Sequence, residues 1–208
     1  GFVPYLPYQP VPTALLEDAM SFQRKTVRRP GRVRDDKRIE QMVRVDHAGE
    51  YGAVRIYRGQ RAVFANRASK SRIAGQLQHM EADEQHHLDA FDDHIRNGLT
   101  RPTLMGPLWD AAGFALGAVT ALIGERAAHA CTEAVENVIE GHYGRQVEEL
   151  RLMGETELAD QFARFQAEEV EHKDLAVDEG AKDALGYPIL SAAITAGCHA
   201  AIAVTERV

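Results

Sequence analysis

Residues 82–89 read ADEQHHLD and residues 167–174 read AEEVEHKD, so one Glu-x-x-His motif occurs twice, 85 residues apart. The similarity extends beyond the motif, because alanine and an acidic residue precede each glutamate and an aspartate lies two residues after each histidine. On a helix, residues three apart project from the same side. Each motif can therefore direct one carboxylate and one imidazole toward a common point, and the repeat predicts two such helices.

A single glutamate precedes each motif at nearly the same distance. Glu50 lies 34 residues before Glu84, and Glu136 lies 33 residues before Glu169. An offset of 86 residues also relates two further identical pairs, Tyr57 with Tyr143 and Gln60 with Gln146. A duplicated helical hairpin explains these matches, and its symmetry selects six candidate metal ligands that we also expect to be catalytic: Glu50, Glu84, His87, Glu136, Glu169 and His172.

Strong helix formers with a spacing of 3.6 residues predict four helices, at residues 36–66, 69–97, 124–153 and 155–182. Short breaks join the first two and the last two, as in antiparallel hairpins. The connection from residue 97 to residue 124 is long enough to run along a bundle. We therefore predict an all-α four-helix bundle over residues 36–208, with residues 1–35 as an N-terminal arm or linker.

Four carboxylates and two imidazoles facing inward from four helices form the ligand set of a di-iron or di-manganese centre. The absence of thiolate ligands disfavours zinc and iron–sulfur clusters. Other acids and histidines near the motifs lack a repeat partner of the same ligand type or point elsewhere, and we exclude Glu133, Glu140, Glu171 and His86. Candidates that would orient the ligands are Asp46, Tyr57, Tyr143 and, with weaker support, His142. For the two tyrosines, a role as core residues is the favoured interpretation.

The composition of the 208-residue chain limits which kinds of partner it can bind. Its formal net charge of −7 argues against nucleic acid as a general partner. Two cysteines, Cys131 and Cys198, give no disulfide framework or zinc spacing, and Cys131 is expected to be a buried structural residue. Residues 24–38 hold eight basic side chains and two acidic ones, which fits a solvated linker, a targeting remnant or a contact with anionic lipid.

Two apolar segments accompany the predicted bundle. Leu104–Ile123 contains 14 apolar residues in 20 with Asp110 as its single charge, and Tyr187–Val204 has His199 as its only ionisable residue. The aspartate, Pro107 and three glycines argue against a clean membrane span in the first segment. We expect an apolar crossover between helices two and three and an additional apolar C-terminal helix, both lying against a membrane surface. The alternative is that both are helices of a large core.

The residues 45–53, VDHAGEYGA, carry a specific resemblance to a known family. Further matching stretches are Ile56-Tyr57 with Gln60, Pro107-Leu108-Trp109, residues 113–117, residues 130–132 and 134–136, and His142-Tyr143. Over roughly residues 39–207 the chain resembles the demethoxyubiquinone hydroxylases of ubiquinone biosynthesis. The resemblance implies a ferritin-like fold and carries the family's six ligands onto the six residues that the repeat selects.

The same resemblance implies a di-iron monooxygenase that hydroxylates demethoxyubiquinol at the penultimate step of the pathway. It would use two iron ions, O2 and reducing equivalents, with NADH as the electron source. As a separate hypothesis, we predict that Glu84, Glu136 or both bridge the metals. The resemblance further implies a peripheral membrane protein on the cytoplasmic face of a bacterial inner membrane or the matrix face of the mitochondrial inner membrane. A lipid-binding protein of a biosynthetic complex is an expected partner.

Two other classes of protein remain open from the sequence. A ferritin-like protein that stores iron or reduces peroxide would use the same ligands, although it would not need two apolar segments. A non-enzymatic scaffold would keep the bundle alone, but buried carboxylates without a metal are costly.

Overall fold

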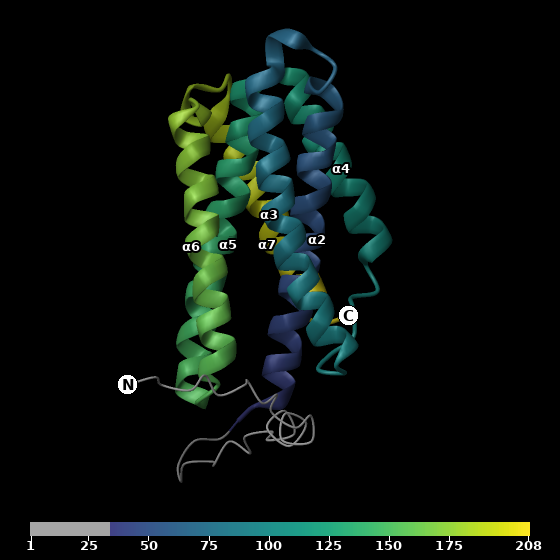
Figure 1. Cartoon of the computed structure of the whole chain (residues 1–208), viewed down its shortest axis with the longest axis vertical. Coiled ribbons are helices and arrows are strands. Elements are labelled where there is room, and N and C mark those ends of the chain that lie inside the picture. Colours follow the sequence, from purple (N-terminus) through teal and green to yellow (C-terminus); the bar gives the residue numbers. More distant parts are fainter. Residues whose placement is uncertain (1–33) are drawn as a thin grey trace, which may run out of the picture. The chain divides into compact units, whose positions relative to one another are not determined.

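The computed structural model describes residues 34–208, and the expectations for residues 1–33 lie outside this range. The described chain is helical almost throughout and has no β-strand (Figure 1). This confirms the predicted all-α class. The helices are α2 (Asp36–Phe64), α3 (Ser71–Arg96), α4 (Gly106–Ile123), α5 (Glu125–Met153), α6 (Thr156–Asp178) and α7 (Tyr187–Thr205), with short 3-10 turns at Ala68–Lys70 (η1) and Ala181–Asp183 (η2).

Local sequence signals set the helix ends. The Asp35 side chain accepts a 3.0 Å hydrogen bond from the Arg38 amide and caps the start of α2. Gly154 adopts a left-handed conformation (φ 82°) that ends α5, as the predicted break requires. The fourth predicted helix is shorter than expected, because α6 stops at Asp178 and Gly180 turns the chain with φ 86°.

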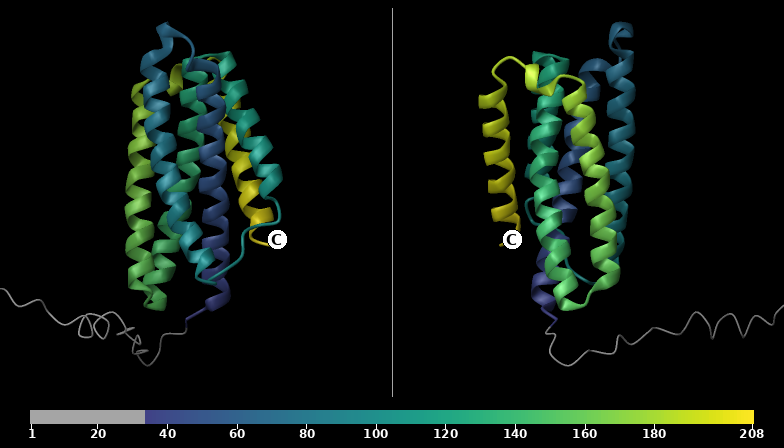
Figure 2. Two further views of the ribbon diagram at one scale, coloured as in Figure 1. Left: turned by 45° about the vertical axis from the view of Figure 1, so that its right-hand side comes forward. Right: turned by 90° about the vertical axis from the view of Figure 1, so that its left-hand side faces the viewer.

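The four predicted helices form the bundle as two antiparallel hairpins, α2 with α3 and α5 with α6 (Figure 1). Helix α4 packs along α2, and α7 packs along α5, outside the bundle (Figure 2). Contacts at one end tie α4 to the C-terminus, since Trp109 Nε1 donates to Thr205 Oγ1 at 3.2 Å and Thr103 Oγ1 donates to the Val208 carbonyl at 3.2 Å. The bundle with two additional apolar helices is therefore confirmed.

Helix α4 approaches α2 so closely that a side chain at the glycine positions of their interface would collide with the facing backbone. A Cβ atom on Gly117 would lie 2.0 Å from the Ile56 carbonyl oxygen, and one on Gly59 would lie 2.2 Å from that of Phe114. The lone charge of α4 is also bound to α2, because Asp110 accepts a 2.8 Å hydrogen bond from the Tyr51 hydroxyl and pairs with Arg55 at 2.6 Å. The close packing and the contacts of Asp110 together hold α4 against the bundle.

The outer faces of α4 and α7 are apolar and exposed. Leu122 of α4 is 68% exposed and Ile189 of α7 is 79% exposed. The alternative in which both segments are core helices is therefore wrong. By length and composition alone, each helix would be able to cross a bilayer. The exposed apolar side chains indicate that these two faces contact an apolar partner.

Candidate metal centre

The six candidate ligands converge in the interior of the four-helix bundle. Each of α2 and α5 supplies one glutamate, and each of α3 and α6 supplies one Glu-x-x-His pair. All six side chains are buried. Potential ligand atoms form two groups, each within 4.8 Å, namely Glu50, Glu84, His87 and Glu169, and Glu84, Glu136, Glu169 and His172.

Two carboxylates belong to both groups. The two oxygens of Glu84 face different imidazoles, with Oε1 3.2 Å from His172 Nδ1 and Oε2 3.7 Å from His87 Nδ1. Those of Glu169 do the same, at 3.1 Å from His87 Nδ1 and 3.4 Å from His172 Nδ1. Glu136 belongs to one group only. Glu84 and Glu169 therefore each face both imidazoles, whereas Glu136 belongs to the group that contains His172 alone.

Most potential ligand atoms at the centre make no hydrogen bond, although carboxylates and imidazoles face one another at 3.1–3.7 Å. In the described chain, the inward Nδ1 atoms of both histidines and both oxygens of Glu84 and Glu169 are buried and accept or donate no hydrogen bond. One oxygen each of Glu50 and Glu136 is also unpartnered. Buried charged groups are paired, protonated or bound to a metal, and oxygen-rich sites with imidazole suit iron or manganese. The residues thus fit a two-metal carboxylate centre.

The electrostatics of the cluster show how strongly it would favour cations. Burial and neighbouring carboxylates raise the pKa of both Glu50 and Glu136 well above its usual range. Burial opposes the charged form of Glu84 as well, but the facing imidazoles of His172 and His87 outweigh it and lower its pKa to about 2. Burial likewise opposes the charged form of His172, yet its carboxylate neighbours raise its pKa to about 12. Bound cations would replace protons in this cluster.

Two tyrosines link the halves of the duplicated fold at the site. Tyr57 of α2 donates a 2.6 Å hydrogen bond to Glu136 Oε1 of α5, and Tyr143 of α5 donates a short hydrogen bond to Glu50 Oε1 of α2. Both rings are buried in the core. The interpretation of these residues as core side chains is therefore incomplete, since each also orients a candidate ligand from the opposite hairpin.

The outward nitrogens of the two imidazoles contact a second pair of carboxylates. His87 Nε2 lies 2.5 Å from Glu168 Oε2, and His172 Nε2 lies 3.2 Å from Asp83 Oδ2. A carboxylate on the outer nitrogen fixes the tautomer that leaves Nδ1 free for a metal. Sequence reasoning missed this role, although Asp83 and Glu168 occupy equivalent positions in the two repeats.

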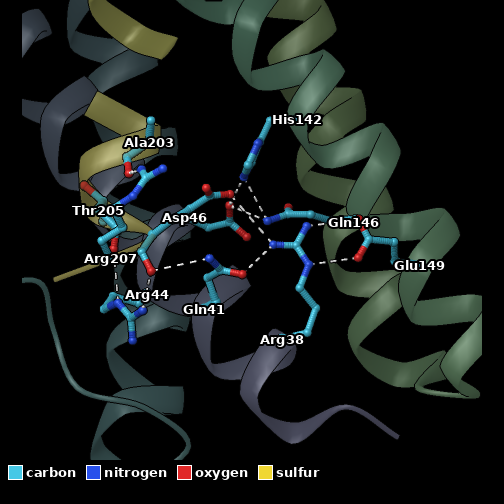
Figure 3. A network of polar contacts seen from close by, with 11 residues as sticks. Arg38, Gln41, Arg44, Asp46, His142, Gln146, Glu149, Ala203, Thr205 and Arg207 are labelled. Carbon is cyan, nitrogen blue, oxygen red and sulfur yellow. Dashed lines mark hydrogen bonds and ion pairs between the residues drawn. The ribbon is translucent and has the colours of Figure 1, made fainter. Parts of the chain in front are cut away.

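Asp46 takes part in a different network, shown in Figure 3. Its Oδ1 atom accepts a 3.0 Å hydrogen bond from Gln146 Nε2 and lies 3.4 Å from His142 Nε2. Nearby, Arg38 binds Glu149 and joins this cluster to the first turns of α2 (Figure 3). The contacts of Asp46 thus connect α2 with α5 one turn away from Glu50.

The excluded residues have other partners or face away. The Glu140 carboxylate pairs with Lys173, and Glu133 accepts a 3.0 Å hydrogen bond from the Tyr187 hydroxyl. The side chains of Glu171 and His86 are exposed. Cys131 is buried and free, as expected.

An apolar cavity of about 550 Å³ lies on the other side of α2 and α5 from the metal ligands. Its walls come from α2 and α5 and from the two outer helices α4 and α7. Trp109 and Thr205 line one part of it, and Ile56, Leu190 and Cys198 line others. Gly49 and Val135, which directly precede Glu50 and Glu136, also line it, so the cavity reaches the backbone that carries two candidate ligands.

A four-helix bundle with inward glutamates and two Glu-x-x-His pairs defines the class of di-iron and di-manganese carboxylate proteins. The chain belongs to the family described as "Ubiquinone biosynthesis protein COQ7", whose model matches residues 37–205.

Named relatives share nearly the whole described region. A "3-demethoxyubiquinol 3-hydroxylase" of Rhodospirillum rubrum is 46% identical over 97% of this chain and 93% of the relative. The "NADPH-dependent 3-demethoxyubiquinone 3-hydroxylase, mitochondrial" of Homo sapiens is 42% identical over 81% of this chain and 77% of its own length. A "5-demethoxyubiquinone hydroxylase, mitochondrial" of Saccharomyces cerevisiae is 37% identical over 82% of this chain and 78% of the relative. The predicted family is therefore confirmed.

Proposed function

We propose that this protein is a di-iron monooxygenase that hydroxylates the ring of demethoxyubiquinol in ubiquinone biosynthesis. The observation that supports it best is the set of buried, unpartnered ligand atoms beside an apolar cavity. The names of the relatives describe hydroxylases acting on demethoxyubiquinol or demethoxyubiquinone. The penultimate position in the pathway rests on the resemblance alone.

In this proposal, six residues hold two iron ions: Glu50, Glu84, His87, Glu136, Glu169 and His172. Glu84 and Glu169 belong to both groups of ligand atoms and would be available to either iron ion, while each remaining ligand belongs to one group. When bound, the iron pair would supply the redox chemistry that activates O2. Asp83 and Glu168 hold the imidazoles in place, while Tyr57 and Tyr143 hold the unshared carboxylates.

The reaction converts one ring C–H bond into C–OH and consumes O2, two electrons and two protons, with water as the second product. The protein must therefore orient the ring and exclude bulk water from the centre. The apolar cavity between α4 and α7 suits an isoprenoid tail, because its lining is almost entirely hydrocarbon. Ligand-bearing turns of α2 and α5 form its floor, which would bring the ring close to the metals.

Reduced nicotinamide cofactor is the proposed electron source. The sequence-based expectation is NADH, whereas the mammalian relatives are named NADPH-dependent. Oxygen-dependent turnover with each cofactor in turn, at equal concentrations, would separate the two. Equal rates with NADH and NADPH would indicate that the protein accepts electrons from either cofactor.

We further propose that α4 and α7 lie against a membrane and take the substrate from it. Their exposed leucine and isoleucine side chains would enter the interfacial region. The eukaryotic relatives are named mitochondrial, and the corresponding site in a bacterium would be the inner membrane. A lipid-binding protein partner stays a prediction from the family resemblance.

The decisive experiment is hydroxylation with ¹⁸O₂ after anaerobic loading with Fe(II). We expect about two iron ions per chain and one labelled oxygen in the quinol product. Glu169→Gln should lose iron and turnover, whereas Glu171→Gln, two residues away on the exposed face of α6, should keep both. Iron uptake without labelled product would favour the alternative, an iron-storage or peroxide-reducing protein.

A further inference from the structure

The two halves of the duplicated fold differ where they line the cavity. On α2 the lining residues near the metal ligands include Gly49, Gly52 and Ala53. At the equivalent positions of α5, 86 residues later, stand Val135, Val138 and Ile139, which also line the cavity. At these three positions the α2 wall therefore has little or no side chain, and the α5 wall has branched side chains.

Close helix packing does not explain the two glycines, Gly49 and Gly52, on the cavity side of α2. A Cβ atom on Gly49 or Gly52 would meet no atom within 4 Å, whereas a Cβ atom on Gly59 of the same helix would lie 2.2 Å from the Phe114 carbonyl oxygen. Glycine in a helix interior is less stable than alanine. Since Gly49 and Gly52 have no steric requirement from the protein, the space they leave suits a ligand.

Ala53 and Ile139 lie between the cavity and the bundle interior. Ala53 packs in the interior cluster that contains Tyr57, while Ile139 packs against the interior cluster that contains Tyr143 and also against the cluster on the cavity side. No other cavity-lining residue of the described chain belongs to either of these two interior clusters. These two side chains therefore contact both the cavity and the interior clusters that hold the two tyrosines.

The tyrosine hydrogen bonds lie on either side of these two residues. Ala53 lies three residues after Glu50 and four before Tyr57, and Ile139 lies at the same distances from Glu136 and Tyr143. Because Tyr57 reaches Glu136 and Tyr143 reaches Glu50, the two residues sit between two links that join α2 and α5. Between the two tyrosine links, the cavity-lining side chains that pack into the interior are the small Ala53 and the branched Ile139.

We propose that the substrate ring reaches the metal pair between α2 and α5 at Ala53 and Ile139, and that it rests on the bare backbone of Gly49 and Gly52. These four residues are positioning residues for the reaction. Because Gly49 and Gly52 have no side chain, they determine the size of the ring that fits. The inference rests on the proposed function, and it names the part of the cavity that a planar quinol ring occupies while the tail extends between α4 and α7.

The first test compares two glycine substitutions in otherwise intact, iron-loaded protein. Gly52→Leu should reduce kcat/KM for hydroxylation of a demethoxyubiquinol at least tenfold, with unchanged iron content. Gly52→Ala should raise Tm by about 1–4 °C, because alanine favours the helix, and should still lower kcat/KM. Full turnover by Gly52→Leu would overturn the proposal.

Gly75 provides the matched control, since it lies inside α3, is exposed, and a Cβ atom added to it would meet no other atom within 4 Å. Gly75→Leu should leave iron content and turnover unchanged. If it reduces turnover as much as Gly52→Leu does, the effect belongs to helix substitution in general and the proposal fails.

The second test exchanges the side chains of Ala53 and Ile139, between which we propose that the ring passes. Ala53→Ile should lower kcat at least tenfold, and adding Ile139→Ala should restore it to within about threefold of the wild-type protein, because the exchange returns the lost space. Trp109, the single tryptophan, lines the cavity, and quenching of its fluorescence by a quinone reports binding independently of turnover. Ala53→Ile should keep this quenching.

The two hypotheses fail in different ways. Absence of hydroxylation by the wild-type protein with iron bound would overturn the proposed function. If the wild-type protein hydroxylates normally, two results would overturn only the proposed route between Ala53 and Ile139. One is failure of the double exchange to restore kcat, and the other is loss of tryptophan quenching in Ala53→Ile.

Discussion

Tyr57 of α2 and Glu136 of α5 are joined by a 2.6 Å hydrogen bond that connects the two halves of the duplicated fold. Tyr143 makes the equivalent bond to Glu50 in the opposite direction. Each half therefore holds an unshared carboxylate of the other half in place. This arrangement makes the position of both glutamates depend on assembly of the whole bundle.

Removing one of these hydroxyl groups should weaken metal binding while the bundle stays folded. Tyr57→Phe leaves Glu136 Oε1 without its donor, and loss of such a supporting group lowers metal affinity by about 10- to 100-fold. Competition titration with an Fe(II) chelator measures the change. Tyr187→Phe is the control, because that hydroxyl binds Glu133 away from the centre. Unchanged affinity in Tyr57→Phe would show that Glu136 does not need the tyrosine.

The outer carboxylates on the imidazoles should contribute to the same affinity. Glu168→Gln and Asp83→Asn each replace a negative acceptor on a histidine Nε2 atom with a neutral amide. We expect about a 10- to 100-fold loss of iron affinity from each, with near-native helicity by circular dichroism. Asp174→Asn, exposed on α6, should have no effect. If the three variants bind iron alike, the hydrogen bonds to Nε2 are not needed to hold the ligands.

The sequence was sufficient to predict the bundle and to bring six residues together, because duplication preserved ligand type at one spacing. It also contained the repeated acids Asp83 and Glu168, but it did not reveal that each contacts the histidine of the opposite hairpin. That relationship depends on how α3 and α6 pack, and helical spacing within one chain segment carries no information about it.

The cavity was the least predictable feature. Gly49 and Gly52 of α2 and Val135 and Val138 of α5 line it together with residues of α4 and α7, so its position depends on how four helices pack. From the sequence, the crossover glycines indicate only that a clean membrane span is disfavoured. In the structure, Gly117 has a steric role, because α4 meets the Ile56 carbonyl there.

Gly117→Ala should therefore destabilise the protein. The added methyl group would lie 2.0 Å from the Ile56 carbonyl oxygen, and backbone atoms on both sides limit relaxation. Overpacking of this kind costs about 1–3 kcal/mol. Urea denaturation followed by circular dichroism measures the free energy of unfolding. Gly75→Ala, which has open space, should be neutral or stabilising, and equal behaviour of the two variants would contradict close packing of α4 on α2.

The exposed faces of α4 and α7 should govern membrane binding. Leu122→Glu and Ile189→Glu each replace an exposed apolar side chain with a charge. Burial of a leucine or isoleucine contributes about 1.5–3 kcal/mol, so each variant should bind vesicles of phosphatidylcholine and phosphatidylglycerol at least tenfold more weakly in a flotation assay. Leu152→Glu, on α5 and 73% exposed, should bind like the wild-type protein. Weaker binding by all three would indicate a nonspecific effect of charge.

His129 should make the fold sensitive to acid. Its ring is buried in α5, and neither nitrogen has a hydrogen-bond partner. Burial lowers the pKa of His129 below its usual value, so the unfolded chain binds the proton more readily than the folded protein. Stability should therefore fall as the pH drops through the unfolded-state pKa of about 6.5.

Replacing the ring with an apolar side chain of similar size should remove this sensitivity. An unpartnered buried polar group costs about 1–3 kcal/mol, so His129→Met should be more stable than the wild-type protein at pH 7.5. The difference should widen between pH 7 and pH 5, because only the wild-type protein loses stability through this group. Urea denaturation across that range provides the measurement, and a constant difference would show that His129 does not titrate on unfolding.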